Sequence, residues 1–157
     1  MSCFVAAQRY TSAMNPTIDI HWLAVIVATV ASFIFGFLWW GPIFGRTWAR
    51  ALGLPMDGDF SGMVKPMLLN LTGNFLTSYV LVFSTNVWRA SAWGLSPDLA
   101  SGSIGFFSGL FTWMGFYIPL LLNQVAWEKR PWNVFLINAG GHLLSLQLIA
   151  QIVAHWR

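Results

Sequence analysis

The sequence predicts an all-α integral membrane protein with four transmembrane helices. Of its 157 residues, 57% are hydrophobic and 8% are charged, whereas a soluble domain carries about 25% charged residues. The mean hydropathy is +0.63, and the apolar residues gather in continuous runs of helical length. These runs lack the period-2 alternation of a membrane-spanning β-strand. We therefore expect lipid to contact most of the surface, so that the bilayer is the main partner.

Four windows are long enough to cross about 30 Å of hydrocarbon, which takes about 20 helical residues. Their expected bounds are 22–40, 64–83, 103–122 and 134–156. The only formal charge inside them is Lys65, at an edge where its aliphatic stem lets the ammonium reach the headgroups. We expect a single membrane domain over residues 22–157, preceded by an N-terminal tail over residues 1–21.

The segment before Met14 has one arginine, no acid and no long apolar core. It is too short and too polar for a signal peptide, and it suits either a weak targeting leader or a start assigned too far upstream. We favour a true start at Met14, because NPTIDIHW after it suits a short extramembrane lead-in.

The first span ends in FGFLWWGPIFGRTW, residues 35–48. Indole prefers the headgroup layer, so two adjacent tryptophans mark the expected membrane boundary. Pro42 should break or kink the helix there, and FGRTWARAL after it predicts a short interfacial helix. The residues expected to act as interfacial anchors are Trp39, Trp40, Pro42, Arg46, Trp48, Trp127 and Trp132.

Basic residues are unequally shared between the two sides of the four-span arrangement. Loops one and three carry five of them, namely Arg46, Arg50, Lys65, Lys129 and Arg130. The opposite side carries three, namely Arg9, Arg89 and Arg157. The positive-inside rule therefore predicts that loops one and three are cytoplasmic and that both termini are outside.

An internal repeat is visible in the second and fourth spans. MLLNLTGNFLTSYVL (67–81) aligns without gaps on FLINAGGHLLSLQLI (135–149) at an offset of 68 residues. The pattern predicts a 2+2 duplicated helical hairpin. Because each unit has an even number of spans, the halves should be parallel and related by a pseudo-twofold axis along the membrane normal.

The repeat aligns six polar residues that share one helical face in each half. This candidate intramembrane site consists of Asn70, Asn74, Thr77, Asn138, His142 and Ser145. One interpretation is that they form hydrogen bonds that hold the helices together. The other is a small polar site or pathway, in which His142 is the mid-span group able to titrate near neutral pH.

Other polar and small residues favour helix packing. The small-residue stripes are Ala24, Ala28, Ala31 and Ser32 on span one, and Ser101, Gly105, Ser108, Gly109 and Thr112 on span three. Such stripes let helix backbones approach closely in lipid. Gln147 and Gln151 lie on the face of span four opposite His142, so they should face another helix, another subunit or the outer interface. We hypothesise a homodimer contact there.

No set of residues predicts catalysis. The sequence has no Ser-His-Asp or Cys-His set, no phosphate-binding glycine loop and no CxxC. Its five acids, Asp19, Asp57, Asp59, Asp98 and Glu128, lie in loops or tails. A lone mid-span imidazole lacks the other ligands of a metal or haem site, so we expect no metal and no cofactor. No basic cluster exceeds two adjacent residues, which disfavours nucleic acid.

The stretch FGFLWWGPIFGRTWARALGL resembles a family of small bacterial membrane proteins known as domain of unknown function 1761. In that family the first span ends in a Trp-aromatic-x-Pro turn followed by Phe-Gly-Lys/Arg-x-Trp. The matching residues are Trp39, Trp40, Pro42, Phe44, Gly45, Arg46 and Trp48. FTWMGFYIPLLLNQVAWEKRPWNVFLINAG is similar to the family's third span and its Glu-containing loop.

This resemblance covers almost everything after Met14, and it departs at Trp40-Gly41, where Tyr-Ser is common. It implies four spans and a bacterial inner membrane, and it brings no activity or catalytic residue. We expect a non-enzymatic accessory, structural or interaction protein, in a homodimer or larger membrane complex. The alternative is a small transporter, channel or lipid- or small-molecule-binding protein that uses the candidate intramembrane site.

Overall fold

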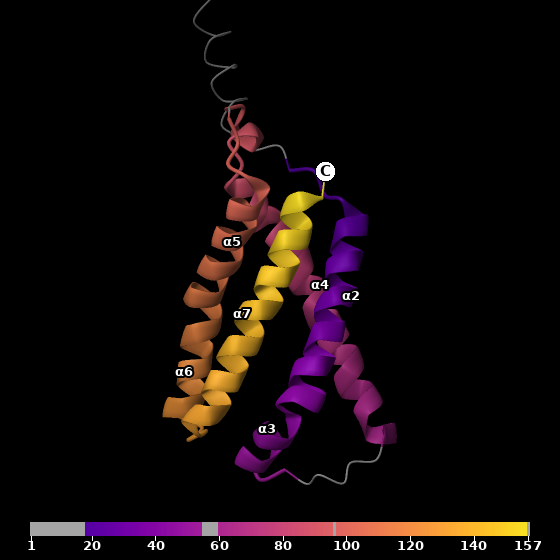
Figure 1. Cartoon of the computed structure of the whole chain (residues 1–157), viewed down its shortest axis with the longest axis vertical. Coiled ribbons are helices and arrows are strands. Elements are labelled where there is room, and N and C mark those ends of the chain that lie inside the picture. Colours follow the sequence, from indigo (N-terminus) through magenta and orange to yellow (C-terminus); the bar gives the residue numbers. More distant parts are fainter. Residues whose placement is uncertain (1–17, 55–59, 96, 157) are drawn as a thin grey trace, which may run out of the picture.

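The computed structural model describes residues 18–54, 60–95 and 97–156, and the regular elements in these ranges are all helices. The long helices form four rods, which run up and down beside one another (Figure 1). Each is long and apolar enough to cross a membrane, and their bounds are Trp22–Ile43, Val64–Val87, Ser101–Ala126 and Trp132–His155. The prediction of an all-α, four-helix membrane protein is confirmed. The expected start at Met14 lies outside the described residues.

The rods contain the following elements: α2 (Trp22–Leu38), η1 (Trp39–Ile43), α4 (Val64–Val87), α5 (Ser101–Thr112), η4 (Trp113–Tyr117), α6 (Ile118–Ala126) and α7 (Trp132–His155). Short helices connect them: α3 (Gly45–Ala51), η2 (Phe60–Met63) and η3 (Ser91–Trp93). The third rod extends four residues beyond its expected end, because the helix continues through NQVA despite two polar amides. A helix is present where FGRTWARAL predicted one, and its position at the membrane interface stays a prediction.

Two π-helical turns, η1 and η4, interrupt the α-helical geometry. The first lies where the sequence predicted a break or a kink at Pro42, and the second lies where the sequence predicted no irregularity. Pro42 lies inside η1, and Pro119 follows two residues after η4. Proline lacks an N–H and its ring clashes with the carbonyl four residues earlier. The wider π-turn relieves this clash by adding one residue to the turn, so the chain remains helical past Pro42. The backbone N–H of Phe44 accordingly donates to the Trp39 carbonyl at 2.9 Å.

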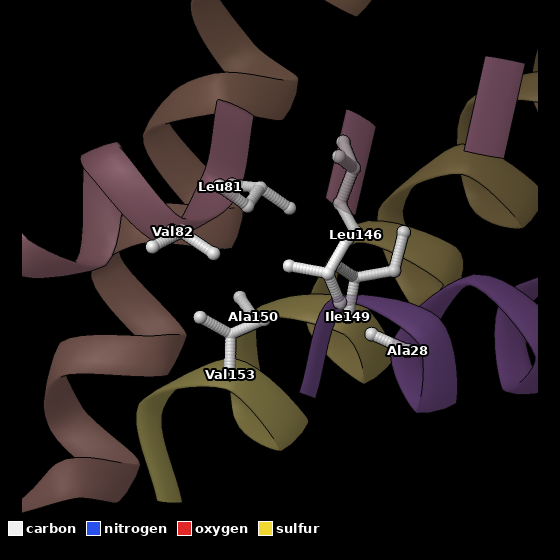
Figure 2. Close-up of a cluster of buried hydrophobic side chains, with 8 residues drawn as sticks. Ala28, Leu81, Val82, Leu146, Ile149, Ala150 and Val153 are labelled. Atoms are coloured by element: carbon white, nitrogen blue, oxygen red, sulfur yellow. The ribbon is translucent and has the colours of Figure 1, made fainter. Parts of the chain in front are cut away.

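The helix α7 lies at the centre of the bundle and contacts α2, α4, α5 and α6. Its apolar core partners come from α2 and α4, and Figure 2 shows these side chains converging. The members of this core cluster are Val25, Ala28, Leu81, Val82, Leu146, Ile149, Ala150 and Val153. Large apolar side chains remain exposed on the outward faces of the rods, as at Phe116, which is 75% exposed. Lipid solvates such a surface and water does not.

The helices α5 and α7 form a close seam through the small residues of α5. Gly105, Ser108 and Gly109 are buried there. A Cβ added at Gly109 would lie 2.9 Å from Nε2 of Gln147, and one at Gly105 would lie 3.0 Å from Cδ of Gln151. Glycine therefore makes room for the two amide side chains.

Both glutamine amides donate hydrogen bonds across this seam. Nε2 of Gln147 donates to the Phe106 carbonyl at 3.1 Å, and Nε2 of Gln151 donates to the Gly102 carbonyl at 3.0 Å. The sequence left three possible partners for these amides, namely another helix, another subunit or the outer interface. In the structure the partner is a helix of the same chain. The homodimer hypothesis loses the observation that motivated it.

Candidate functional site

A cavity of about 340 Å³ lies at the end of the bundle where α3 and the α6–α7 turn are found. We call it the loop-side cavity. Five of the six predicted site residues line it, namely Asn70, Asn74, Asn138, His142 and Ser145. Thr77 is half-buried one turn further along α4 and does not line it. The other lining residues are Ser32, Gly36, Trp40, Trp48, Tyr117, Leu120, Leu121, Gln124 and Arg130.

The imidazole of His142 lies between two aromatic rings. Its centroid is 5.2 Å from that of Trp40 and 4.8 Å from that of Tyr117, with interplanar angles of 48° and 46°. Trp40 belongs to η1 and Tyr117 to η4, so each π-turn contributes one ring. His142 is half-buried and makes no hydrogen bond to any residue that the structure describes. Its ring nitrogens are therefore free for a partner in the cavity.

Three indoles attach the first rod to α7 by hydrogen bonds. Oδ1 of Asn138 accepts from Nε1 of Trp40 at 3.0 Å and from Nε1 of Trp48 at 3.1 Å. Nε1 of Trp39 donates to the Ile137 carbonyl at 3.0 Å. These N–H groups were expected to meet the headgroup layer. In the structure they bond to acceptors on α7, and their depth in the membrane stays a prediction. Trp127 and Trp132 are 83% and 60% exposed, and anchoring by them stays a prediction.

Gly141 lets these indoles lie directly on α7. A Cβ at this position would be 2.6 Å from Nε1 of Trp39 and 2.7 Å from Cζ2 of Trp40. Both are atoms of rigid rings that hydrogen bonds already hold in place. Gly141 is therefore needed for close approach, and through it for the position of the Trp40 ring beside His142.

A second hydrogen-bond network joins α2, α4 and α7 along one wall of the cavity. Oγ of Ser32 donates to Oδ1 of Asn74 at 3.1 Å, and it lies 2.7 Å from Oγ of Ser145. Because the Ser32 hydroxyl has one hydrogen, Ser145 must donate to Ser32. Nδ2 of Asn74 donates to Oδ1 of Asn70 at 2.9 Å. These residues therefore do hold helices together, as one interpretation of the sequence expected.

The mouth of the cavity carries a charged pair. Nε of Arg130 lies 2.7 Å from Oε2 of Glu128, and both side chains are partly exposed. An exposed pair of this kind contributes only about 0–1 kcal/mol. The pair therefore adds little net charge to the cavity.

The cavity has a side that faces away from the bundle. The helix α4 packs on α2 and α7, and α6 packs on α7, while the ends of α4 and α6 nearest this cavity diverge (Figure 1). The lining residue Asn70 of α4 is exposed, and Leu120 of α6 is 58% exposed. The cavity therefore borders the outer surface of the bundle at Asn70 and Leu120.

Sequence reasoning missed several lining residues. Ser32 was assigned only to a packing stripe, although serine hydroxyls often form hydrogen bonds between membrane helices. Tyr117 is a mid-span phenol, and the same rule could have identified it. Gln124 and Arg130 gave no signal, because the third rod was expected to end before them.

One family model covers most of the chain. The model of a family described as "Protein of unknown function (DUF1761)" matches residues 23–154. The chain belongs to this family. The matched region includes every residue that lines the loop-side cavity. No curated protein and no solved structure gives a significant match to the chain. The description of DUF1761 names no activity, so a function for this member has to be argued from its own residues.

Proposed function

We propose that this DUF1761 protein binds a small polar molecule, or the polar end of an amphiphile, in the loop-side cavity. The observation that carries the proposal is the imidazole of His142, which lines the cavity and has no hydrogen-bond partner among the described residues. A polar ring at this depth in a membrane protein is costly unless it is partnered. A bound ligand supplies the missing partner.

The chemistry of the lining favours a ligand with hydrogen-bonding groups and little net charge. The amides of Asn70 and Asn74 and the hydroxyl of Tyr117 offer neutral donors and acceptors. Arg130 adds one cation at the mouth, already balanced by Glu128. The rings of Trp40 and Tyr117 suit a flat or apolar part of the same ligand.

The exposed lining residues Asn70 and Leu120 support entry from the bilayer, which favours a ligand with an apolar tail. We propose the bacterial inner membrane as the location, with loops one and three in the cytoplasm. The cavity then opens toward the cytoplasmic leaflet.

A continuous channel is less well supported than binding. The core cluster fills the bundle along α2, α4 and α7 beyond the cavity, with Leu81, Leu146 and Ile149 each 1% exposed. A polar solute would have to cross this apolar layer to reach the other side. The accessory or structural role expected first from the sequence needs no cavity, and it stays a prediction.

The test is to extract the full chain with its surrounding lipid in a polymer nanodisc and to identify the bound molecules by mass spectrometry. We expect a species that co-purifies with the wild type and falls about tenfold in His142→Ala, since one lost hydrogen bond to a buried polar group is worth about 1.4 kcal/mol. Thr77→Ala is the matched control, because Thr77 shares the predicted face but not the cavity. Equal amounts in all three proteins would contradict the proposal.

A further inference from the structure

A second cavity lies at the opposite end of the bundle, where the C-terminus and the start of α2 are found. Its volume is about 320 Å³, and we call it the terminus-side cavity. Residues from the lead-in to α2, from the end of α4 and from the end of α7 line it. Among them are one acid, Asp19, and one strong base, Arg89, with Asn86 and Trp156 beside them.

Arg89 is held in place by a helix end. Its Nη2 donates to the Ala154 carbonyl at 2.5 Å, which is one of the last four carbonyls of α7 and lacks a partner within that helix. The negative end of the helix dipole favours a cation there. Arg89 has no carboxylate partner among the described residues. Most of its five N–H donors therefore remain for another acceptor.

Asp19 lines the same cavity and is exposed. It has neither a hydrogen bond nor an ion pair with any residue in the described ranges. The two opposite charges thus border one cavity without pairing with each other. Their arrangement matches a ligand that carries both charges in the reverse order, with its anion at Arg89 and its cation at Asp19.

We propose that the terminus-side cavity binds a zwitterion with a phosphate or carboxylate and a primary ammonium. The guanidinium fork of Arg89 suits a phosphate or carboxylate, which it can bind through two N–H groups. Nδ2 of Asn86 already donates to the Val82 carbonyl at 2.8 Å. Its Oδ1 can therefore accept from the ammonium, in addition to the carboxylate of Asp19. The core cluster separates this site from the loop-side cavity, so the two proposals are independent.

Two sources share this ligand chemistry. One is the headgroup of an ethanolamine phospholipid, because the cavity lies at the ends of α4 and α7, where a spanning helix meets the headgroup layer. The other is a free zwitterion such as glycerophosphoethanolamine or an amino acid. Both present an ammonium that donates hydrogen bonds, which a quaternary choline group cannot do.

Calorimetry on the purified full chain tests the ligand class. Glycerophosphoethanolamine should bind about tenfold more tightly than glycerophosphocholine or glycerol phosphate, since each comparison removes one charge-assisted hydrogen-bonding group. Arg89→Gln and Asp19→Asn should each weaken binding about tenfold, while Thr77→Ala, at a residue that lines neither cavity, should bind as the wild type does. Asp19→Asn changes an exposed side chain that has no partner among the residues the structure describes, so it separates ligand binding from folding even if Arg89→Gln unfolds.

A second measurement separates the two sources. Nanodiscs made from equal phosphatidylethanolamine and phosphatidylcholine, analysed by native mass spectrometry, should retain ethanolamine lipid on the wild type and lose it in Asp19→Asn if the source is lipid. Binding of glycerophosphoethanolamine without lipid enrichment identifies a free zwitterion. The proposal is overturned if the folded wild type shows neither binding nor enrichment, or if Asp19→Asn matches the wild type in both.

Discussion

The two faces of α7 use their polar residues in different ways. On the face toward α5, Gln147 and Gln151 donate to backbone carbonyls across a seam that glycine keeps narrow. On the opposite face, Trp40 and Tyr117 flank His142, which borders a cavity and makes no hydrogen bond to the described part of the chain. Asn138 and Ser145, on the same face as His142, also bond to neighbouring helices. The two faces therefore differ in His142, which is the one of these three residues without a hydrogen bond to the described part of the chain.

Among the substitutions that test this comparison, Gly141→Ala should lower the free energy of unfolding the most. The added Cβ would overlap the rings of Trp39 and Trp40, and overpacking of this kind costs about 1–3 kcal/mol. We expect a loss of about 3 kcal/mol in the free energy of unfolding, measured by SDS titration in mixed micelles. The repeat-equivalent Gly73→Ala is the control, because nothing lies within 4 Å of a Cβ there. An equal loss in both variants would show that Gly141 is not a point of close approach.

An intermediate effect is expected for Asn138→Leu. The substitution removes the acceptor of two indole N–H groups, and each such bond in a membrane bundle is worth about 0.6–2 kcal/mol. We expect about 2 kcal/mol of destabilisation in the same titration, together with a shift in tryptophan fluorescence as Trp40 and Trp48 are released. Asn123→Leu, at an exposed position of α6, should leave both readouts near wild type. Unchanged fluorescence in Asn138→Leu would contradict the indole bonding.

The smallest effect is expected when Gln147 and Gln151 are both changed to leucine. Their acceptors already take part in the α5 helix, so only about 1 kcal/mol should be lost for the pair. The mass of the complex in detergent, measured by light scattering, should not change, because both amides are used within one chain. A change in oligomeric state would restore the homodimer contact that the sequence suggested.

The helices themselves could be predicted from the sequence, since continuous apolar runs of about 20 residues have few alternatives. The packing role of Gly105 and Gly109 was also predictable, because small residues at helical spacing allow close approach. Five of the six candidate polar residues do line one cavity. The periodicity of 3.6 residues and the repeat alignment were enough to group them.

Other features could not be read from the sequence because they depend on neighbouring helices. A proline such as Pro42 signals disturbed helix geometry, but whether the helix breaks or widens into a π-turn depends on packing outside it. An indole N–H can donate either to the lipid headgroups or to a side chain such as that of Asn138. The sequence alone does not distinguish these two acceptors. The duplication of the two hairpins, the orientation in the membrane and the division into tail and domain stay predictions.

The series of hydrogen bonds from Ser145 through Ser32 and Asn74 to Asn70 has a consequence for selectivity. Every donor in it points the same way, so the small dipoles add, and the positive end falls on the NH₂ group of Asn70 at the exposed rim. If one member of the series reversed its direction, its neighbour would lose a hydrogen bond. The direction is therefore fixed, and it gives the wall a permanent polarity without any ionised group. An incoming carbonyl or ether oxygen is attracted at this rim, whereas an incoming ammonium group is repelled.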